Sequence, residues 1–313
     1  AATSSIPREF ILYCMFDVHA HLHDEAFVGD RDATVDRARA VGLEGIVTIG
    51  TDPEENRRAV ACAEAYPDVW VSVGLHPHFF NEAEENTNSS TQIPNKTQSR
   101  DQKFQKEIQE LRAIAESSNR VVAIGECGLD YYRRQSADSN QQETITEEQK
   151  VLQREGFLAQ IAIAEDLDLP LIIHTRPSLG SMDAYEDIFE ILKERQGKLT
   201  AILHCYMGDL SVTEKFLSLP GVSFSFTGNI TYKVKEGSDR DETLRMIPID
   251  RMLSETDCPY LAPVPYRGQR NEPAYVAEVV RCIALIRQMT YTETEERIGI
   301  NVRRAFPRMF EII

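Results

Sequence analysis

The sequence predicts an α/β fold, and within that class a (β/α)8 barrel, or TIM barrel. Short apolar runs rich in β-branched residues recur along the chain, and charged segments with helical spacing of their apolar positions separate them. The runs are almost continuously apolar, as expected of parallel strands that are buried on both faces. The length of 313 residues fits a barrel of roughly 250 residues with one insertion. An open, doubly wound sheet is the main alternative.

Eight apolar runs are expected to form the strands, and they span 11–21, 43–50, 69–78, 121–130, 169–175, 199–206, 221–229 and 251–260. The segments between them have apolar residues at the spacing of helices that pack one face on a sheet. These predicted helices span 30–41, 53–65, 104–117, 146–167, 183–196, 209–218 and 239–246, with 273–288 and 293–311 after the last strand.

One polar segment interrupts this alternation. Residues 81–103 contain one Ile and one Ala among many Asn, Ser, Thr and Gln residues, so they have little apolar surface to bury. We therefore expect a flexible insertion loop after the third strand. The rest of the chain is expected to form a single domain, so the predicted unit is one barrel over residues 1–313 with this loop at 81–103.

The composition is that of an acidic globular protein. The chain has 34 Lys and Arg against 50 Asp and Glu, a net charge of −16, and 42% hydrophobic residues. No apolar stretch reaches the roughly 18 residues of a membrane span, so we expect a soluble protein without a membrane partner. The six cysteines are scattered singly, which indicates free thiols in a reducing compartment. A cytoplasmic location is expected, with the nucleus as an alternative, and the oligomeric state stays open.

All seven histidines lie at the carboxyl ends of predicted strands. Because these ends meet at one face of a parallel barrel, the sequence pattern predicts a spatial cluster of imidazoles. The histidines are His19, His21 and His23 at the first strand, His76 and His78 at the third, His174 at the fifth and His204 at the sixth.

The first strand ends in a pair of candidate metal ligands. His19 and His21 are two residues apart, so both imidazoles point to the same side of an extended strand and can bind one ion. Asp17 has two interpretations that the sequence does not separate. Its carboxylate either accepts a hydrogen bond from an imidazole N–H or packs as a buried acid at the strand end.

Two acids complete the candidate cluster. Glu126 follows a buried apolar strand between glycines, where an unpaired carboxylate is costly unless a cation is near, and its two oxygens can bridge two ions. Asp257 ends the eighth strand, which closes on the first, and Glu255 is a weaker candidate. His174 and His204 supply nitrogen ligands for a second ion.

The predicted ligand set therefore holds four imidazoles and two carboxylates, which is enough for two divalent ions if Glu126 bridges them. Mixed nitrogen and oxygen ligation suits Zn, Mn, Fe or Mg. Two such ions activate water and stabilise both oxygens of a displacement, so hydrolysis is the expected chemistry. The ligands are His19, His21, Glu126, His174, His204 and Asp257.

Five ordered motifs match those of a known family, and they contain Asp17-Val-His19-Ala-His21, Gly74-Leu-His76-Pro-His78, Gly125-Glu126-Cys-Gly-Leu-Asp130, His204-Cys-Tyr and Glu255-Thr-Asp257-Cys-Pro259. In these motifs the chain resembles the TatD family of metal-dependent deoxyribonucleases, from about residue 14 to the final helix. The resemblance implies a TIM barrel of the metal-dependent hydrolase type. It also implies a dinuclear site, with Mg expected in action and Zn or Mn as alternatives, and 3′ to 5′ exonuclease activity on DNA.

The resemblance also implies roles for individual residues. Glu126 and Asp257 act in catalysis, with Asp257 taking a proton from the attacking water, and His76 is the expected contact to a substrate phosphate. The implied partners are DNA ends or single-stranded segments, with RNA as a further substrate. The residues implied in substrate binding are His76, His78, Lys233, Arg267 and Arg270.

Two other functions compete with this interpretation. The first is an amidohydrolase acting on a cyclic amide or lactone, although many of those enzymes bridge their ions with a modified Lys where this chain has Glu126. The second is a catalytically silent scaffold with an acidic binding surface. A charge of −16 opposes nucleic-acid binding, but two divalent ions would contribute about +4 at the mouth, so we expect weak, salt-sensitive binding.

Overall fold

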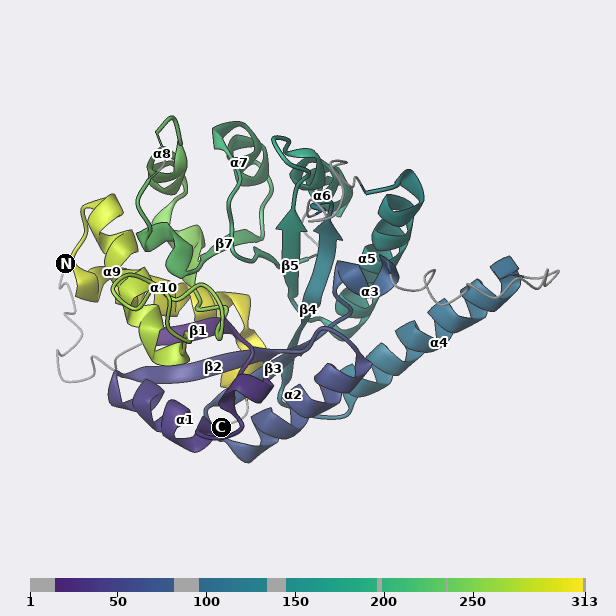
Figure 1. Ribbon diagram of the computed structural model, residues 1–313, viewed down its shortest axis with the longest axis horizontal. Coiled ribbons are helices and arrows are strands. Elements are labelled where there is room, and N and C mark those ends of the chain that lie inside the picture. The colour runs from purple at the N-terminus through teal and green to yellow at the C-terminus, as the bar shows by residue number, and fades with distance from the viewer. Residues whose placement is uncertain (1–14, 82–95, 134–144, 196–198, 235, 312–313) are drawn as a thin grey trace, which may run out of the picture.

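The computed structural model describes residues 15–81, 96–133, 145–195, 199–234 and 236–311. Eight parallel strands form one sheet in the order of the chain, from β1 to β8. Helices lie between consecutive strands and surround the sheet (Figure 1). The predicted barrel is confirmed, and the open doubly wound sheet is excluded because its strand order would not follow the chain.

The strands of the barrel are β1 Met15–Ala20, β2 Leu43–Ile49, β3 Val69–Val73, β4 Val121–Asp130, β5 Leu171–Arg176, β6 Ala201–Leu203, β7 Val222–Phe226 and β8 Met252–Ser254. The helices are α1 Arg31–Ala40, α2 Pro53–Ala65, α3 Pro77–Asn81, α4 Lys96–Glu116, α5 Glu147–Leu167, α6 Asp183–Lys193, α7 Leu210–Leu217, α8 Arg240–Met246, α9 Val276–Arg287 and α10 Tyr291–Ala305. Short 3-10 turns cover Glu25–Phe27, Gly228–Thr231, Ile249–Arg251, Pro273–Tyr275 and Pro307–Phe310.

The core forms because the strands have apolar residues on both faces. Every residue of β1 and β4 is buried, and the side chains facing outward pack against the apolar sides of the helices. Alternate residues point into the barrel, so a polar residue near a strand's carboxyl end is placed at the mouth. The fold thus gathers residues that are distant in sequence at one end of the barrel.

The barrel closes between its first and last strands, at a seam formed largely by the residues that follow β8. Asp257 N–H donates to the carbonyl of His19 at 2.8 Å, and His21 N–H donates to the carbonyl of Cys258 at 2.8 Å. The Asp17 carboxylate accepts a hydrogen bond from the backbone N–H of Thr256 at 2.9 Å. The seam therefore joins both predicted ligands of the first strand to Asp257.

The structure differs from the predicted insertion loop over 81–103 at both ends. Asn81 is the last residue of α3, and residues 96–103 form the first turns of α4; residues 82–95 lie outside the described part of the chain. Lys, Gln and Arg are good helix formers, so a polar composition does not prevent a helix that extends from a packed segment. Phe104 and Ile108 pack that helix on the core, and its amino-terminal part projects past the other helices (Figure 1).

The carboxy-terminal region also differs in detail from the predicted helix over 293–311. α10 ends at Ala305, and a 3-10 turn begins at Pro307, which has no N–H to continue the helix. None of the helices in the described ranges combines the length and the apolarity needed to cross a membrane.

Candidate active site

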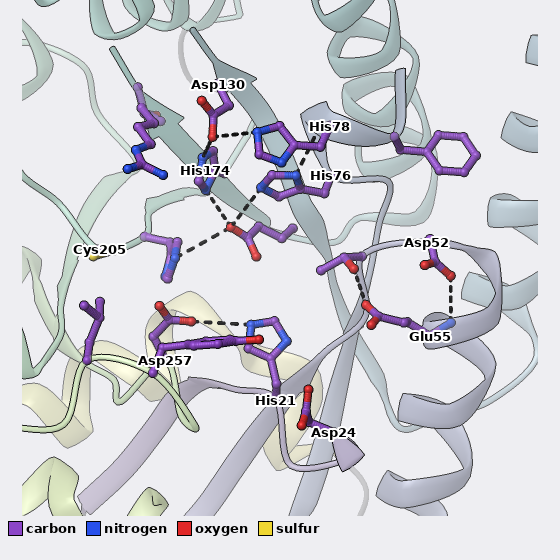
Figure 2. Close-up of a pocket in the computed structure, with 18 of the residues that line it drawn as sticks. His21, Asp24, Asp52, Glu55, His76, His78, Asp130, His174, Cys205 and Asp257 are labelled. Carbon is purple, nitrogen blue, oxygen red and sulfur yellow. Dashed lines mark hydrogen bonds and ion pairs between the residues drawn. The ribbon is translucent and has the colours of Figure 1, made fainter. Parts of the chain in front are cut away.

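A cavity of about 820 Å³ opens at the carboxyl ends of the strands, and we call it the main cavity. Its wall contains six of the seven histidines together with Glu126, Asp130 and Asp257. The seventh, His19, is buried and its Nε2 lies 3.5 Å from Glu126 Oε2. Figure 2 shows two groups facing each other across this space, with His76, His78 and His174 on one side and His21 and Asp257 on the other.

The first group of donor atoms comes from β1, β4 and the segment after β8. His19 Nε2 is 3.5 Å from Glu126 Oε2 and 3.7 Å from Asp257 Oδ1, and His21 Nε2 is 3.4 Å from the same Asp257 oxygen. These separations are longer than ordinary hydrogen bonds. They match the spacing of about 3.4 Å between two ligands of a tetrahedral ion with bonds of about 2.1 Å.

The second group surrounds the other oxygen of Glu126. Its Oε1 is 2.7 Å from His174 Nδ1, 3.7 Å from His204 Nε2 and 3.8 Å from His76 Nε2. The two carboxylate oxygens of Glu126 therefore face two different sets of imidazole nitrogens. This arrangement is what a carboxylate that bridges two cations requires.

Three of the imidazoles have an acceptor behind them that determines which nitrogen faces the cavity. His21 Nδ1 is 3.1 Å from the carbonyl oxygen of Ile49, and His174 Nε2 is 3.1 Å from Asp130 Oδ2. His204 Nδ1 and Glu255 Oε1 form an ion pair at 2.8 Å, and that oxygen accepts a hydrogen bond from the N–H of Cys205. Such outer acceptors are typical of metal-binding histidines, because they hold the proton on the nitrogen away from the ion.

Burial and unsatisfied atoms also fit a cation. Both ring nitrogens of His19 are buried without a hydrogen-bond partner among the described residues, which is costly unless a ligand engages them. Burial would raise the pKa of Glu126, but its contacts with His174 and His19 outweigh burial and hold that pKa well below its usual value. An ionised carboxylate at this depth requires positive charge nearby, which protons supply here and divalent ions would supply when bound.

Comparison with known proteins gives the family. Residues 16–307 match the family described as TatD related DNase. The chain belongs to the TatD family. Because the match spans nearly all of the chain, it includes every element that contributes to the main cavity.

Relatives within the TatD family are similar over almost their full length. The chain is 35% identical to the metal-dependent hydrolase YabD of Bacillus subtilis (strain 168), an alignment covering 93% of this chain and 98% of that protein. It is 34% identical to the 3′-5′ ssDNA/RNA exonuclease TatD of Erwinia tasmaniensis, covering 93% and 99% of the two chains.

Solved structures of the TatD family share the fold. The TatD homologue YjjV of Escherichia coli K12 superposes with a TM-score of 0.76 at 24% identity, over 95% of this chain and 99% of that one. A TatD-family hydrolase of Entamoeba histolytica gives a TM-score of 0.72 at 20% identity, over 93% and 97%. These structural similarities support the barrel fold, and the chemistry of the site depends on its own residues.

The five residues predicted to bind substrate lie in different places. His76 and His78 line the main cavity, and His78 Nε2 is 3.0 Å from Asp130 Oδ2. The guanidinium of Arg270 is paired with Asp30 at 2.7 Å, outside the main-cavity wall. Arg267 stacks on the ring of Tyr232 at 4.4 Å, and Lys233 lies beside that ring in a neighbouring cavity.

Two buried acids outside the predicted set of six ligands contribute to the site, namely Asp130 and Glu255, of which Glu255 was only a weaker candidate. Asp130 lies four residues after Glu126 on β4, and Glu255 lies two residues before Asp257, so even spacing along an extended segment was the available signal for both. Of the two interpretations of Asp17, the structure supports a buried acid at the strand end. Its carboxylate accepts hydrogen bonds from the backbone N–H groups of Thr256 and His19. His23 pairs with the Thr48 hydroxyl at 3.1 Å and lies apart from Glu126.

Proposed function

We propose that the chain is a nuclease that hydrolyses phosphodiester bonds of DNA by two-metal activation of water, acting from the 3′ end toward the 5′ end. The observation that carries the proposal is Glu126, whose two oxygens face separate sets of imidazole nitrogens. Relatives named as 3′-5′ ssDNA/RNA exonucleases support single-stranded DNA as substrate, with RNA as a second one.

The donor set would hold the ions in two groups. His19, His21 and Asp257 would bind one and His174 and His204 the other, with Glu126 shared between them. Divalent ions bound there, with Mg expected in action, would activate water and neutralise the charge that develops on the phosphate. Asp257 is suited to take the proton of the attacking water, because its carboxylate lies in the cavity wall among the ligands.

His76 is suited to bind the phosphate undergoing attack. Its Nδ1 accepts a hydrogen bond from the N–H of His78 at 3.2 Å, so a neutral ring carries its proton on Nε2, the atom directed toward Glu126. Burial and the neighbouring His174 lower the pKa of His76 to about 3, so the ring is neutral at pH 7. A neutral N–H donor can bind a phosphate oxygen without competing for the cations.

Degradation of end-labelled oligonucleotides tests this proposal. Single- and double-stranded DNA and single-stranded RNA should be incubated with Mg, Mn, Zn or a chelator, and the products resolved by length. A ladder that shortens from the 3′ end only when metal is present is the expected result. Hydrolysis of a dihydropyrimidine in place of any oligonucleotide would instead favour an amidohydrolase.

Replacement of Glu126 by Ala tests the bridging role. The hydrolytic rate of the variant should be at least about 100-fold lower than that of the wild type, because the carboxylate proposed to be shared by the two ions is removed. Circular dichroism should show an unchanged fold, since the side chain contacts other cluster residues more than the core. Full metal-dependent activity in Glu126→Ala would contradict the proposal.

A further inference from the structure

A second cavity, of about 290 Å³, lies beside the main cavity, and we call it the side cavity. Met207 and Asn229 line both, so the side cavity adjoins the candidate active site directly. Its walls come from the segment after β6, the segment after β7 and helix α8. A strand of nucleic acid bound at Glu126 would pass this opening with its neighbouring nucleotides.

The inner surface of the side cavity is largely apolar, and among the described residues that line it one buried polar side chain, that of Thr243, is unsatisfied. Phe226, Ile230 and Leu244 are buried and form much of its lining. Thr243, only 3% exposed, also lines the cavity, and its hydroxyl has no hydrogen-bond partner among the described residues. Ligand sites typically combine an apolar wall with a few placed polar groups of this kind.

Lysine and arginine side chains are more numerous around the side cavity than in the wall of the main cavity. Lys233 and Arg240 line the side cavity together with Asp239, and Arg240 is paired with Asp241 at 2.9 Å. The guanidinium of Arg267 lies 4.4 Å above the ring of Tyr232 in the same wall. In the main cavity, Arg176 is the one lysine or arginine among the described lining residues. A phosphate flanking the reacting one would therefore meet Lys233 and Arg267 at the rim of the side cavity.

We propose that the side cavity binds a nucleobase of the substrate strand next to the nucleotide undergoing hydrolysis. This inference rests on the proposed nuclease function. A base has apolar faces and a polar edge, which match the apolar lining and the Thr243 hydroxyl. Its phosphate is anionic, which matches Lys233 at the rim. The cavity volume of about 290 Å³ suits one base and is too small for a folded nucleic acid.

Abasic scanning of the substrate tests the proposal. A single tetrahydrofuran residue is moved one position at a time from the 3′ end of a short single-stranded DNA, and kcat/KM is measured for each oligonucleotide. Loss of a bound base should lower kcat/KM about tenfold at one position near the scissile bond and much less elsewhere. The same loss at every position, or at none, would overturn the proposal.

A variant that fills the side cavity links the effect to this place. Val234 lines the side cavity and is 37% exposed, so Val234→Trp fills the opening with little effect on the core. We expect it to lower kcat/KM for the intact oligonucleotide about tenfold and to abolish the abasic effect. Val41→Trp, on the opposite end of the barrel before β2, is the matched control and should keep the wild-type profile.

The outcomes separate this inference from the proposed function. If wild-type protein hydrolyses oligonucleotides but Val234→Trp keeps the abasic effect at the same position, the side-cavity proposal alone is wrong. Thr243→Val, which removes the hydroxyl at nearly constant volume, should lower kcat/KM for some bases more than others. If the wild-type protein hydrolyses no oligonucleotide, both proposals fail together.

Discussion

Two imidazoles in the main cavity each lie between Glu126 and a second acid on the other side of the ring. His204 lies between Glu126 on one side and Glu255 on the other, and His174 lies between Glu126 and Asp130. Each ring is thereby oriented before any ion binds, because an acid lies against each of its two nitrogens. Glu255 and Asp130 thus position two of the proposed ligands, His204 and His174, although neither acid belongs to the predicted set of six.

Replacing Glu255 by Gln should weaken metal binding about 10- to 100-fold, because His204 loses the negative charge that orients it and increases its basicity. Titration against a chelating indicator measures the affinity. Glu214→Gln, on the exposed side of α7, is a control with the same change of charge. Equal affinities for the two variants would show that Glu255 has no positioning role.

Metal binding should release protons at pH 7. Burial lowers the pKa of His174, but its bonds to Asp130 and Glu126 outweigh burial and raise it to about 9. Burial likewise opposes the effect of Glu255 and Glu126 on His204, whose pKa rises to about 10. Both rings are therefore protonated in the metal-free protein, whereas an ion binds the unprotonated nitrogen.

Calorimetric titration with Mn or Zn in buffers of different ionisation enthalpy should report about two protons released per protein, with affinity rising as pH increases toward 9. The stability that protonated His174 and His204 contribute to the metal-free protein is complete below about pH 6.5. It is lost as pH rises through 9 to 10, because the folded pKa values lie above the unfolded ones. A binding enthalpy independent of buffer would contradict this assignment.

The sequence could predict that the six proposed ligands lie close together, because each follows an apolar run and the topology brings the ends of parallel strands together. Glu255 and Asp130 illustrate the limit of that reasoning. Their function depends on which side of a neighbouring imidazole they occupy, and that depends on backbone geometry after the strand ends rather than on residue type. The Arg270–Asp30 pair is similar, since 240 positions separate partners that meet only through closure of the barrel.

Among the helices, α5 has a direct effect on the geometry of the cavity. The Gln153 side chain accepts a hydrogen bond from the Asp130 N–H and donates one to the Asp130 carbonyl. Gln160 does the same for the backbone of Leu75, the residue before His76. One helix thus supports the ends of β3 and β4 through buried amide side chains.

Gln160→Leu should destabilise the protein by about 2–4 kcal/mol, because the buried N–H and carbonyl of Leu75 lose their partners. Urea unfolding measures the change. Glu155→Leu, at an exposed position of the same helix, should change the unfolding free energy by less than about 1 kcal/mol. A small effect at Gln160 would mean that the end of β3 is held by other contacts.

At this scale the sequence predicts element types well and element ends less well. The predicted runs 199–206 and 251–260 are longer than β6 and β8, because the polar residues after each strand turn into the cavity and leave the sheet. α4 begins earlier than predicted, since helix propensity extends it beyond Phe104, where apolar spacing stops being informative.

Over the whole molecule, the charge of −16 opposes the approach of a polyanion, and the basic residues near the site are few. Binding of single-stranded DNA should therefore be weak and should fall steeply with salt. On the proposed function, localised cations such as Lys233 would determine where a bound strand runs more than the net charge would.

Lys233→Ala should weaken binding of a single-stranded oligonucleotide and reduce the slope of log affinity against log salt by about 0.7, the loss of one phosphate contact. Fluorescence anisotropy at several salt concentrations, with Ca in place of Mg to suppress hydrolysis, measures the slope. Lys193→Ala on α6 makes the same charge change at a residue that lines neither cavity, and it should leave the slope unaltered.

The seam between β1 and the segment after β8 has a consequence for how the barrel opens. His19 and His21 belong to one side of this junction and Asp257 to the other, and backbone hydrogen bonds cross it at only a few positions. A cation bound by these three side chains would cross-link the two edges of the sheet where the barrel closes. Removal of the metal should then increase the rate of amide hydrogen exchange in the residues of this seam before it increases the rate in the strands on the opposite side of the barrel.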